Sequence, residues 1–277
     1  MSHPQSALST PAPFIVQVAL QTPSHSGVGD WLSYASPAPL PAGTLVRVPL
    51  GRREVLGVVW DAEEATGELP DGATLRALAG VLEGVAPLDA HWRRLVAFAA
   101  RYYQRALGEV ALAALPPQLR DLQPEQLARR LRRTAKPTGK TQEAGDPQSA
   151  IQTIALSAEQ ESARARISIE KGPFLLFGST GSGKTEVYLR CVQEMLEADT
   201  GDGFPAQALV MVPEINLTPQ LEERFVGRFA PRFGAGAVVS MHSGMTNPQR
   251  LQSWLAAHSG TARIVLGTRM AVFASLP

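Results

Sequence analysis

The 277-residue sequence has one cysteine, little charge and no long apolar run, and each shortage excludes a class of protein. The single Cys191 excludes a disulfide framework and is typical of a reducing compartment. No apolar stretch approaches the roughly 20 residues that a membrane-spanning helix needs. The opening MSHPQSALSTPAP lacks the basic and then apolar order of a secretory signal, so we predict a disordered tail over residues 1–13.

Charge is scarce overall but unevenly distributed. The net charge is only +1, yet the segment 120–140 carries seven basic residues against two acidic ones. The proline and glycine content that follows predicts a linker, which we place at residues 116–150. Two interpretations of the basic segment stay open: contact with a nucleic-acid backbone, or a solvated helix end that runs into the linker. The arginines concerned are Arg129, Arg130, Arg132 and Arg133.

The residues before this linker predict a small β-rich domain closed by helices. Residues 14–20, 44–50 and 54–60 have strand-like apolar patterns, and the last two flank a short G-R-R turn. Residues 91–110 place Trp92, Tyr102 and Tyr103 on one helical face, which we interpret as core.

A phosphate-binding motif stands in the second half of the chain. Residues 178–185 read G-S-T-G-S-G-K-T and match the P-loop pattern. The apolar run 173–177 before it predicts a buried parallel strand, and Val187, Cys191 and Leu196 after it recur at helical spacing. Cys191 is therefore interpreted as a core residue. The alternative is a glycine-rich turn that binds nothing.

The P-loop pattern predicts ATP and Mg²⁺ as ligands. Glycines at positive φ let backbone N–H groups converge on phosphate oxygens, and the following helix directs its positive end at the same anion. Lys184 is expected at the β- and γ-phosphates, and the Thr185 hydroxyl in the Mg²⁺ shell. The remaining loop residues are Gly178, Ser179, Thr180, Gly181, Ser182 and Gly183.

Strands and helices alternate from residue 151 to the end. Residues 208–213, 236–244 and 262–268 predict strands, and residues 221–229 and 247–260 predict helices, the latter with Asn247 as its N-cap. Repeated β–α units imply a parallel sheet with right-handed crossovers.

Four segments together resemble a known family. GSTGSGKTEVYL, MVPEINLTPQ, HSGMTNPQRLQSWL and IVLGTRMAVF are similar to the primosomal replication-restart DNA helicases, the PriA family of superfamily 2. The earlier GDWLSYASP and GTLVRVPLGRREVLGVVWD resemble that family's 3′-DNA-binding domain. The resemblance implies an α/β protein: a β-rich DNA-binding domain at residues 14–115, the linker with a reduced winged-helix region, and an incomplete RecA-like lobe at residues 151–277.

The resemblance also implies roles for residues around the helicase lobe. Gln160 would contact the adenine base, the alternative being an exposed helix residue. Thr218, Thr268 and Arg269 would contact the phosphates of single-stranded DNA without reading sequence. Glu214 would orient a loop rather than perform catalysis.

In the N-terminal domain, the resemblance implies a pocket for the 3′-terminal nucleotide of a nascent strand. Asp30 would accept the base edge and the free 3′-hydroxyl, or it could simply cap a turn. Gly51 would allow close backbone approach, and Arg76 stands where the family carries a lysine. The family has an aromatic residue where this chain has Gly29, so Trp31 would supply the apolar wall instead.

Two functions of different classes are compatible with these segments. The first is an ATP-dependent 3′→5′ helicase of replication restart, with forked and single-stranded DNA, primosome proteins and single-stranded-DNA-binding protein as partners in the bacterial cytoplasm. The second is a fork-binding module without turnover, because no D-E-x-H box occurs in the sequence. Zinc is expected in the full-length family but not from this chain, which has only Cys191. A P-loop kinase would leave VPEINLTPQ and GTRMAVF without a role.

Overall fold

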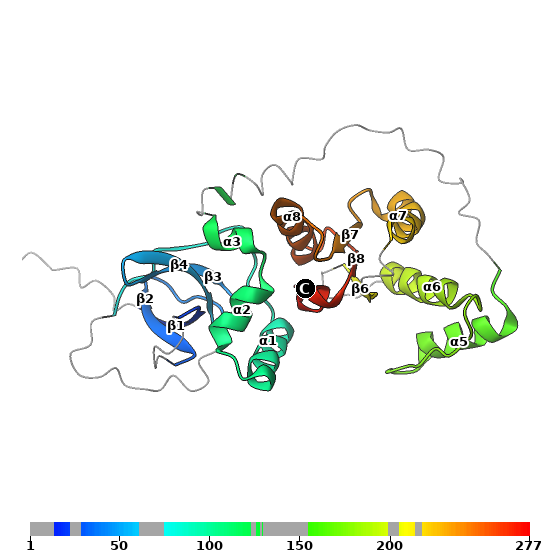
Figure 1. The fold of residues 1–277 in the computed structure, drawn as a ribbon, viewed down its shortest axis with the longest axis horizontal. Helices are drawn as coiled ribbons and strands as arrows, with labels where there is room; N and C mark the ends of the chain where they lie inside the picture. The colour runs from blue at the N-terminus through cyan, green and yellow to red at the C-terminus, as the bar shows by residue number, and fades with distance from the viewer. Residues whose placement is uncertain are drawn as a thin grey trace, which may run out of the picture. The chain divides into compact units, whose positions relative to one another are not determined.

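The computed structural model describes residues 14–22, 29–60, 75–122, 126–127, 129, 155–198, 205–213 and 218–277. The chain divides into two compact units, residues 1–133 (unit 1) and 134–277 (unit 2). Unit 1 is built on an antiparallel sheet and unit 2 on a parallel one, which confirms the predicted fold class (Figure 1).

Unit 1 contains a five-stranded sheet in the order β2-β1-β4-β3-β5. The inner strands of this sheet are covered on both faces, since β3 and β4 each bury four consecutive residues, 45–48 and 56–59. The strands are β1 (Phe14–Leu20), β2 (Trp31–Ser36), β3 (Leu45–Leu50), β4 (Arg53–Val59) and β5 (Gly80–Val81). The segment that includes β5 contacts both β2 and β3. Ala77 forms a bridge to Ala35 of β2, and β5 itself pairs with β3. Val16, Val18 and Val46 belong to the core inside.

The helices of unit 1 whose bounds lie within the described residues are α1 (Ala90–Tyr103), α2 (Leu107–Ala114) and α3 (Pro117–Asp121). Helix α2 packs backbone to backbone on β1. A Cβ added to Gly108 would lie 1.9 Å from the carbonyl oxygen of Leu20, so only glycine allows this contact.

The C-terminal end of α3 is held by a buried arginine of β3. The Arg47 guanidinium donates to the carbonyl oxygens of Leu119 (3.1 Å), Arg120 (2.5 Å) and Leu122 (2.5 Å). Burial lowers the pKa of Arg47, and the acidic Asp121 and Glu54 oppose that shift. Residues 117–122 therefore pack into unit 1, although the sequence placed them in a linker.

Unit 2 has a three-stranded parallel sheet in the order β6-β8-β7. Its strands are β6 (Ala208–Met211), β7 (Val238–Met241) and β8 (Ile264–Gly267). The helices are α5 (Ala158–Ile169), α6 (Lys184–Glu197), α7 (Pro219–Phe233) and α8 (Asn247–His258), and a 3₁₀ turn, η2, covers Arg269–Phe273.

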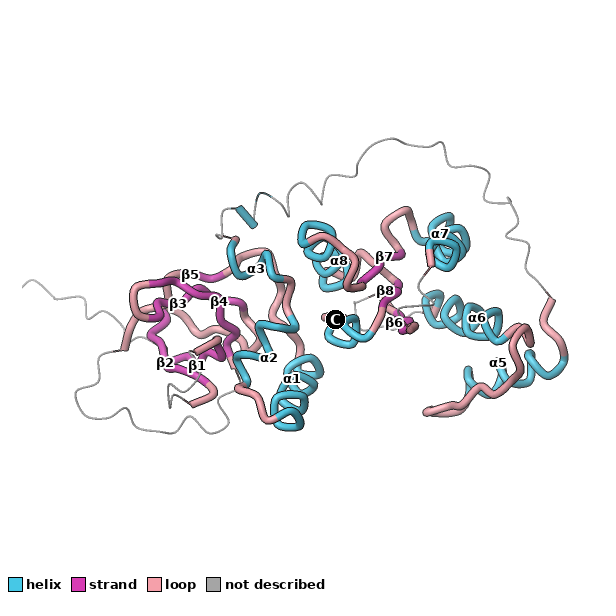
Figure 2. Tube along the Cα trace, viewed as in Figure 1, coloured by secondary structure: helices cyan, strands magenta, loops and turns pink. Residues whose placement is uncertain are grey.

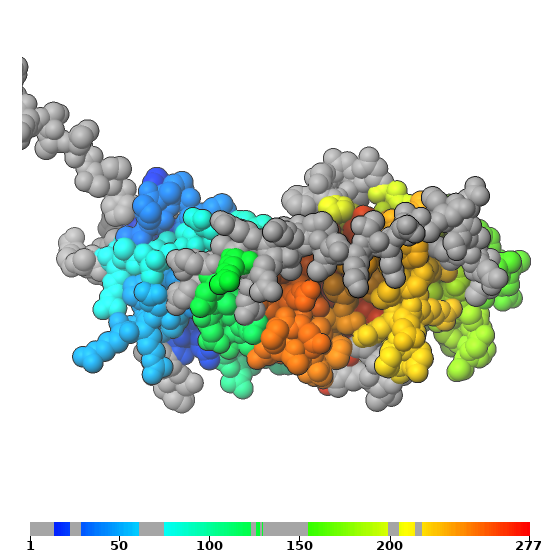
Figure 3. Space-filling view, turned by 90° about the horizontal axis from the view of Figure 1, so that it is seen from above, coloured from blue at the N-terminus to red at the C-terminus, as the bar shows by residue number. Residues whose placement is uncertain are grey.

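Helices cover both faces of this sheet. Leu189 of α6 and Phe225 of α7 pack with Ile264 of β8 on one face, whereas α8 lies on the other side of the strands (Figure 1). The outward surface of α8 is the orange region of the space-filling view (Figure 3). Trp254 fills the inner side of α8 and is completely buried.

The predicted strand at residues 173–177 is not formed. Figure 2 shows this segment as loop, and Leu175 and Phe177 are 90% and 93% exposed. Among the described residues, β6 pairs only with β8, so no neighbouring strand meets this apolar run. The apolar pattern is typical of a strand, but a strand also needs a neighbouring strand to pair with, which the pattern does not specify.

One strand was missed, and two smaller predictions need correction. Strand β2 was not predicted, because its W-L-S-Y-A-S sequence follows a serine- and glycine-rich turn. Tyr102 and Tyr103 are 68% and 70% exposed and so lie outside the core, whereas Trp92 is buried as expected. The N-cap of α8 is Thr246, one residue before Asn247.

Candidate nucleotide and DNA sites

The P-loop glycines shape the turn that precedes α6. Gly181 and Gly183 have φ of +83° and +78°, whereas Gly178 does not adopt positive φ. Gly183 is the N-cap of α6, and no side chain caps the helix. A helix N-terminus without a side-chain cap offers its N–H groups and its dipole to an anion.

Lys184 folds back over the loop. Its ammonium donates to the carbonyl oxygens of Gly178 (2.6 Å) and Ser179 (2.7 Å), and lies 3.4 Å from the hydroxyl of Ser182. A phosphate at the helix N-terminus would offer this ammonium a stronger, charge-assisted partner than two carbonyl oxygens. Thr180 is exposed, and Thr185 is half-buried in the first turn of α6.

Gln160 joins α5 to the P-loop. Its Nε2 donates to the carbonyl oxygen of Ser182 (2.8 Å), and its Oε1 accepts from the backbone N–H of Ser157 (2.8 Å) as part of a capping box. The side chain thus lies beside the phosphate loop. In this state both amide atoms have partners within the protein.

Ion pairs tie α5 to α6 more broadly. Arg164 of α5 pairs with Glu161 of its own helix and with Glu194 of α6, and the Ser168 hydroxyl donates to Glu194 (2.8 Å). The hydrogen bond from Arg164 lowers the pKa of Glu161. Burial raises the pKa of the Cys191 thiol, as expected for a structural rather than a reactive cysteine.

A buried carboxylate lies directly after Thr185. Glu186 of α6 accepts from Arg228 of α7 (2.7 Å) and from Arg190 (3.1 Å), and Arg224 lies 3.9 Å away. The side chains of Glu186 and Arg228 are only 6% and 9% exposed. This cluster fixes the start of α6 against α7. Sequence reasoning missed it because its members are up to 42 residues apart.

A metal site within the P-loop would depend on Thr185. Among the described residues, no group of three or more His, Cys, Asp or Glu side chains could hold a metal ion. The Thr185 hydroxyl and the phosphate oxygens of a nucleotide are oxygen ligands of the kind that suits a hard cation such as Mg²⁺.

The residues expected to touch single-stranded DNA have unequal access to solvent. Thr218 is the N-cap of α7, where its hydroxyl accepts from the N–H of Leu221 (3.3 Å), and it is exposed. Arg269 is exposed at the start of η2, but Thr268 is only 1% exposed and offers its hydroxyl to no external phosphate in this state. Glu214 lies outside the described residues.

The predicted 3′-end residues fall into two groups of contacts. Asp30 is exposed, and its Oδ1 accepts from the N–H of Leu107 (3.1 Å), so it caps the start of α2. Trp31, half-buried, begins β2 beside it. Asp30 thus caps the first turn of a helix, while its side chain stays exposed to solvent.

Gly51 and Arg76 form the second group. Gly51 has φ of +62° in the two-residue turn between β3 and β4, and Arg76 donates to its carbonyl oxygen (3.0 Å). The Tyr34 hydroxyl nearby donates to the carbonyl oxygen of Pro49 (3.1 Å). Burial raises the pKa of Tyr34, and the charge of Arg76 opposes this shift.

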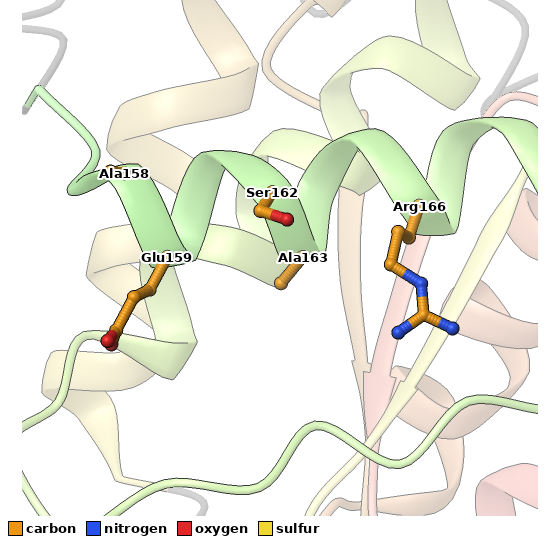
Figure 4. A pocket seen from close by; sticks show the side chains of 5 residues that line it. All are labelled: Ala158, Glu159, Ser162, Ala163 and Arg166. Atoms are coloured by element: carbon orange, nitrogen blue, oxygen red, sulfur yellow. The ribbon is translucent and has the colours of Figure 1, made fainter.

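The basic segment and a hollow along α5 are two further surface features. Of the basic segment, Arg129 is described and exposed, whereas Arg130, Arg132 and Arg133 lie outside the described residues. An open hollow of about 470 Å³ runs along α5, and its lining side chains point to one side of that helix (Figure 4). These residues all come from one helix, so they supply only one wall: Ala158, Glu159, Ser162, Ala163 and Arg166.

Comparison with protein families gives two separate matches. Residues 17–116 match the 3′ DNA-binding domain (3′BD) of PriA, and residues 157–276 match the DEAD/DEAH box helicase family. Both matches agree with the arrangement of an antiparallel unit followed by a parallel one.

Three similar proteins from different bacteria are each named replication restart protein PriA. Replication restart protein PriA of Treponema pallidum is 31% identical over 239 residues, which cover 84% of this chain and 32% of that protein. The PriA proteins of Bacillus subtilis and Haemophilus influenzae are 43% and 41% identical over 101 and 122 residues. These two alignments cover 36% and 43% of this chain, and 11% and 15% of the relatives.

The chain is related to the N-terminal region of PriA. It spans at most about a third of the curated relatives it matches. The PriA resemblance expected from the sequence is thereby confirmed, including its combination of a DNA-binding domain with part of a helicase. The helicase match also identifies a family that uses ATP and Mg²⁺. Among the described residues, no helix is long and apolar enough to cross a membrane.

Proposed function

We propose that this chain takes part in replication restart by binding forked DNA through unit 1 and ATP–Mg²⁺ through unit 2. The observation that carries the proposal is the combination of a 3′ DNA-binding domain match with a complete P-loop at the start of α6. By the PriA resemblance, we further propose that it acts in the bacterial cytoplasm, at the nucleoid, with primosome proteins and single-stranded-DNA-binding protein as partners.

ATP binding would rearrange the contacts of the P-loop. The phosphates would occupy the N-terminus of α6, and Lys184 would exchange its two carbonyl contacts for phosphate oxygens. Thr185 would supply its hydroxyl to Mg²⁺, and Gln160 would turn from Ser182 towards the adenine edge.

Binding of a fluorescent ATP analogue tests this part. We expect Lys184→Ala to weaken binding at least tenfold, because a charge-assisted contact to phosphate is lost. Lys171→Ala, at an exposed lysine before the loop, is the matched control and should bind as the unchanged chain does. Equal affinity of the Lys184 variant would contradict the proposed nucleotide site.

We further propose that this chain alone hydrolyses little ATP. Hydrolysis in helicases needs a carboxylate that holds Mg²⁺ and a base that positions water, and the 277 residues contain no D-E-x-H box. The helicase and the fork-binding module therefore differ in turnover. ATP hydrolysis stimulated by single-stranded DNA would favour the helicase for this chain.

Asp30 is proposed to read the free 3′-end of the nascent strand. Its carboxylate would accept from the 3′-hydroxyl and repel a 3′-phosphate, with Trp31 as the apolar wall and with Gly51 and Arg76 nearer the phosphates. Thr218, Arg269 and the basic segment would hold the DNA backbone without reading sequence.

A pair of forked substrates tests this pocket. Asp30→Asn keeps an oxygen for the N–H of Leu107 but removes the charge, so α2 stays capped. The unchanged chain should prefer a 3′-hydroxyl fork over a 3′-phosphate fork several-fold, and the variant should lose that preference. Glu83→Gln, at an exposed site of unit 1, should leave it intact. No preference in the unchanged chain would refute the pocket.

A further inference from the structure

The first turn of α6 carries an acidic residue close to the place where the phosphates of a nucleotide would bind. Gly183 is the N-cap, so Glu186 is the third residue of the helix. Side chains in an α-helix lean towards its N-terminus, so an acid at the third position can fold back and accept from the N–H of the N-cap residue. The helix dipole also favours an acid there. Glu186 is thus a competitor, within the protein, for the N–H groups that a phosphate needs.

Glu186 does not cap its helix, although residues at the same position cap two other helices of unit 2. Gln160 of α5 accepts from the N–H of its N-cap residue Ser157 at 2.8 Å. Gln249 of α8 accepts from the N–H of its N-cap residue Thr246 at 2.9 Å. At α6, by contrast, no side chain caps the helix. The carboxylate of Glu186 is therefore held away from the end of its own helix.

Arg228 of α7 is the partner that holds this carboxylate. Helix α7 lies beside α6 (Figure 1), and the Nη1 atom of Arg228 donates to Oε1 of Glu186 at 2.7 Å. The Nη2 atom donates to the side chain of Gln193, which is two turns further along α6 (3.2 Å). Arg190, one turn after Glu186, donates to the same carboxylate oxygen at 3.1 Å. These contacts draw the carboxylate towards the C-terminal part of α6, whereas capping would need it at the N-terminus.

We propose that Arg228 is a positioning residue for nucleotide binding, because its pairing with Glu186 keeps the N-terminus of α6 free for phosphate. The pair acts in two ways. It removes a competing acceptor from the backbone N–H groups, and it neutralises a negative charge that would repel the phosphates. Both side chains are almost completely buried, where charges interact more strongly than in water.

This inference rests on the proposed ATP binding of unit 2 and adds a residue from outside the P-loop, 42 positions after Glu186. The same two helices also supply a matched control. Arg232 of α7 pairs with Glu197 of α6 at 2.9 Å, and Glu197 is the last residue of that helix. The Arg232 pair therefore joins α7 to α6 as the Arg228 pair does, but at the end of α6 that is remote from the P-loop.

The first test measures the Kd for a fluorescent ATP analogue in the presence of Mg²⁺. Arg228→Gln removes the charge but keeps a hydrogen-bond donor, and we expect it to raise the Kd about fivefold. Glu186→Met/Arg228→Gln also removes the competing carboxylate, so its Kd should return to within about twofold of that of the unchanged chain. Arg232→Gln should bind as the unchanged chain does.

Hydrogen–deuterium exchange without nucleotide gives a second, independent measurement. In Arg228→Gln the released carboxylate should protect the start of α6, so peptides that contain Gly183 should exchange more slowly than in the unchanged chain. Glu186→Met/Arg228→Gln should restore the faster exchange, because methionine offers only a weak acceptor. If Arg228 were merely structural, its loss would loosen this helix end and speed the exchange instead.

The outcomes separate this inference from the proposed function. Equal Kd values for Arg228→Gln and Arg232→Gln, or a raised Kd that persists in Glu186→Met/Arg228→Gln, would overturn the role of Arg228. If the unchanged chain does not bind the ATP analogue, the proposed nucleotide site fails, whereas slower exchange in Arg228→Gln would still support competition by Glu186. If Arg228→Gln does not fold, Glu186→Met is compared with Glu186→Met/Arg228→Gln. Equal affinities of these two variants support the inference, and unequal affinities overturn it.

Discussion

At the scale of single residues, Glu186 concentrates charge inside unit 2. Its carboxylate accepts from Arg228 and Arg190 with Arg224 close by, and it is almost fully buried. Burial of such a group is tolerated only while its partners remain, because an unpaired buried charge is strongly unfavourable. The contact also sets the position of Thr185, its neighbour in the chain.

We therefore expect Glu186→Gln to lower the free energy of unfolding of unit 2 by about 3 kcal/mol, since three arginines would lose their counter-charge. Urea denaturation followed by circular dichroism measures the change. Glu223→Gln, at an exposed position of α7, serves as the control and should shift stability by less than about 0.5 kcal/mol. A similar value for both variants would show that the cluster contributes little.

At the scale of elements, Arg47 determines where α3 rests. Its guanidinium donates to three carbonyl oxygens at the end of that helix, where the last turn has no intrahelical donors of its own. Arg47→Met should lower the stability of unit 1 by roughly 3 kcal/mol, because buried acceptors would be left without donors. Arg52→Met, in the exposed β3–β4 turn, is the matched control. Equal urea midpoints for the two variants would contradict this role.

The elements also show what the sequence could and could not predict. The P-loop was predicted because its signal is local: glycines at fixed spacing, then a helix that starts at Lys184. The state of residues 173–177 depends on strands elsewhere in the chain, which an apolar run cannot specify. Tyr103 followed the helical pattern of Trp92, yet the packing of α1 against its neighbour α2, which the pattern does not contain, helps decide which positions are covered.

The site residues also differ in whether a local sequence signal or a tertiary contact determines their surroundings. Gln160 was predicted beside the nucleotide from a short motif, and the structure brings it to Ser182. The pocket that would join Asp30 and Arg76 stays a prediction; the structure adds their partners, Leu107 for Asp30 and Gly51 for Arg76. The Glu186 cluster was not predicted, since no local pattern pairs an acid with arginines on another helix.

At the scale of the whole molecule, the two units have separate cores. Val18 belongs to one and Phe225 to the other. We expect two unfolding transitions in urea, with Arg47→Met shifting only one and Glu186→Gln only the other. Residues 1–133, produced alone, should keep the β-rich circular dichroism spectrum of unit 1. A single transition displaced equally by both variants would show that the units fold together.

The exposed segment 173–177 has a consequence for how the protein behaves in concentrated solution. Its sequence P-F-L-L-F carries no charge, and the strand β6 presents a further edge within the described sheet, with Met211 45% exposed. Uncharged apolar segments and open strand edges are templates on which other chains add as strands. Lys171, two residues before the segment, is the nearest charge that opposes such stacking. We therefore expect the purified chain to aggregate as it is concentrated, and we expect a partner that covers this segment to keep it in solution.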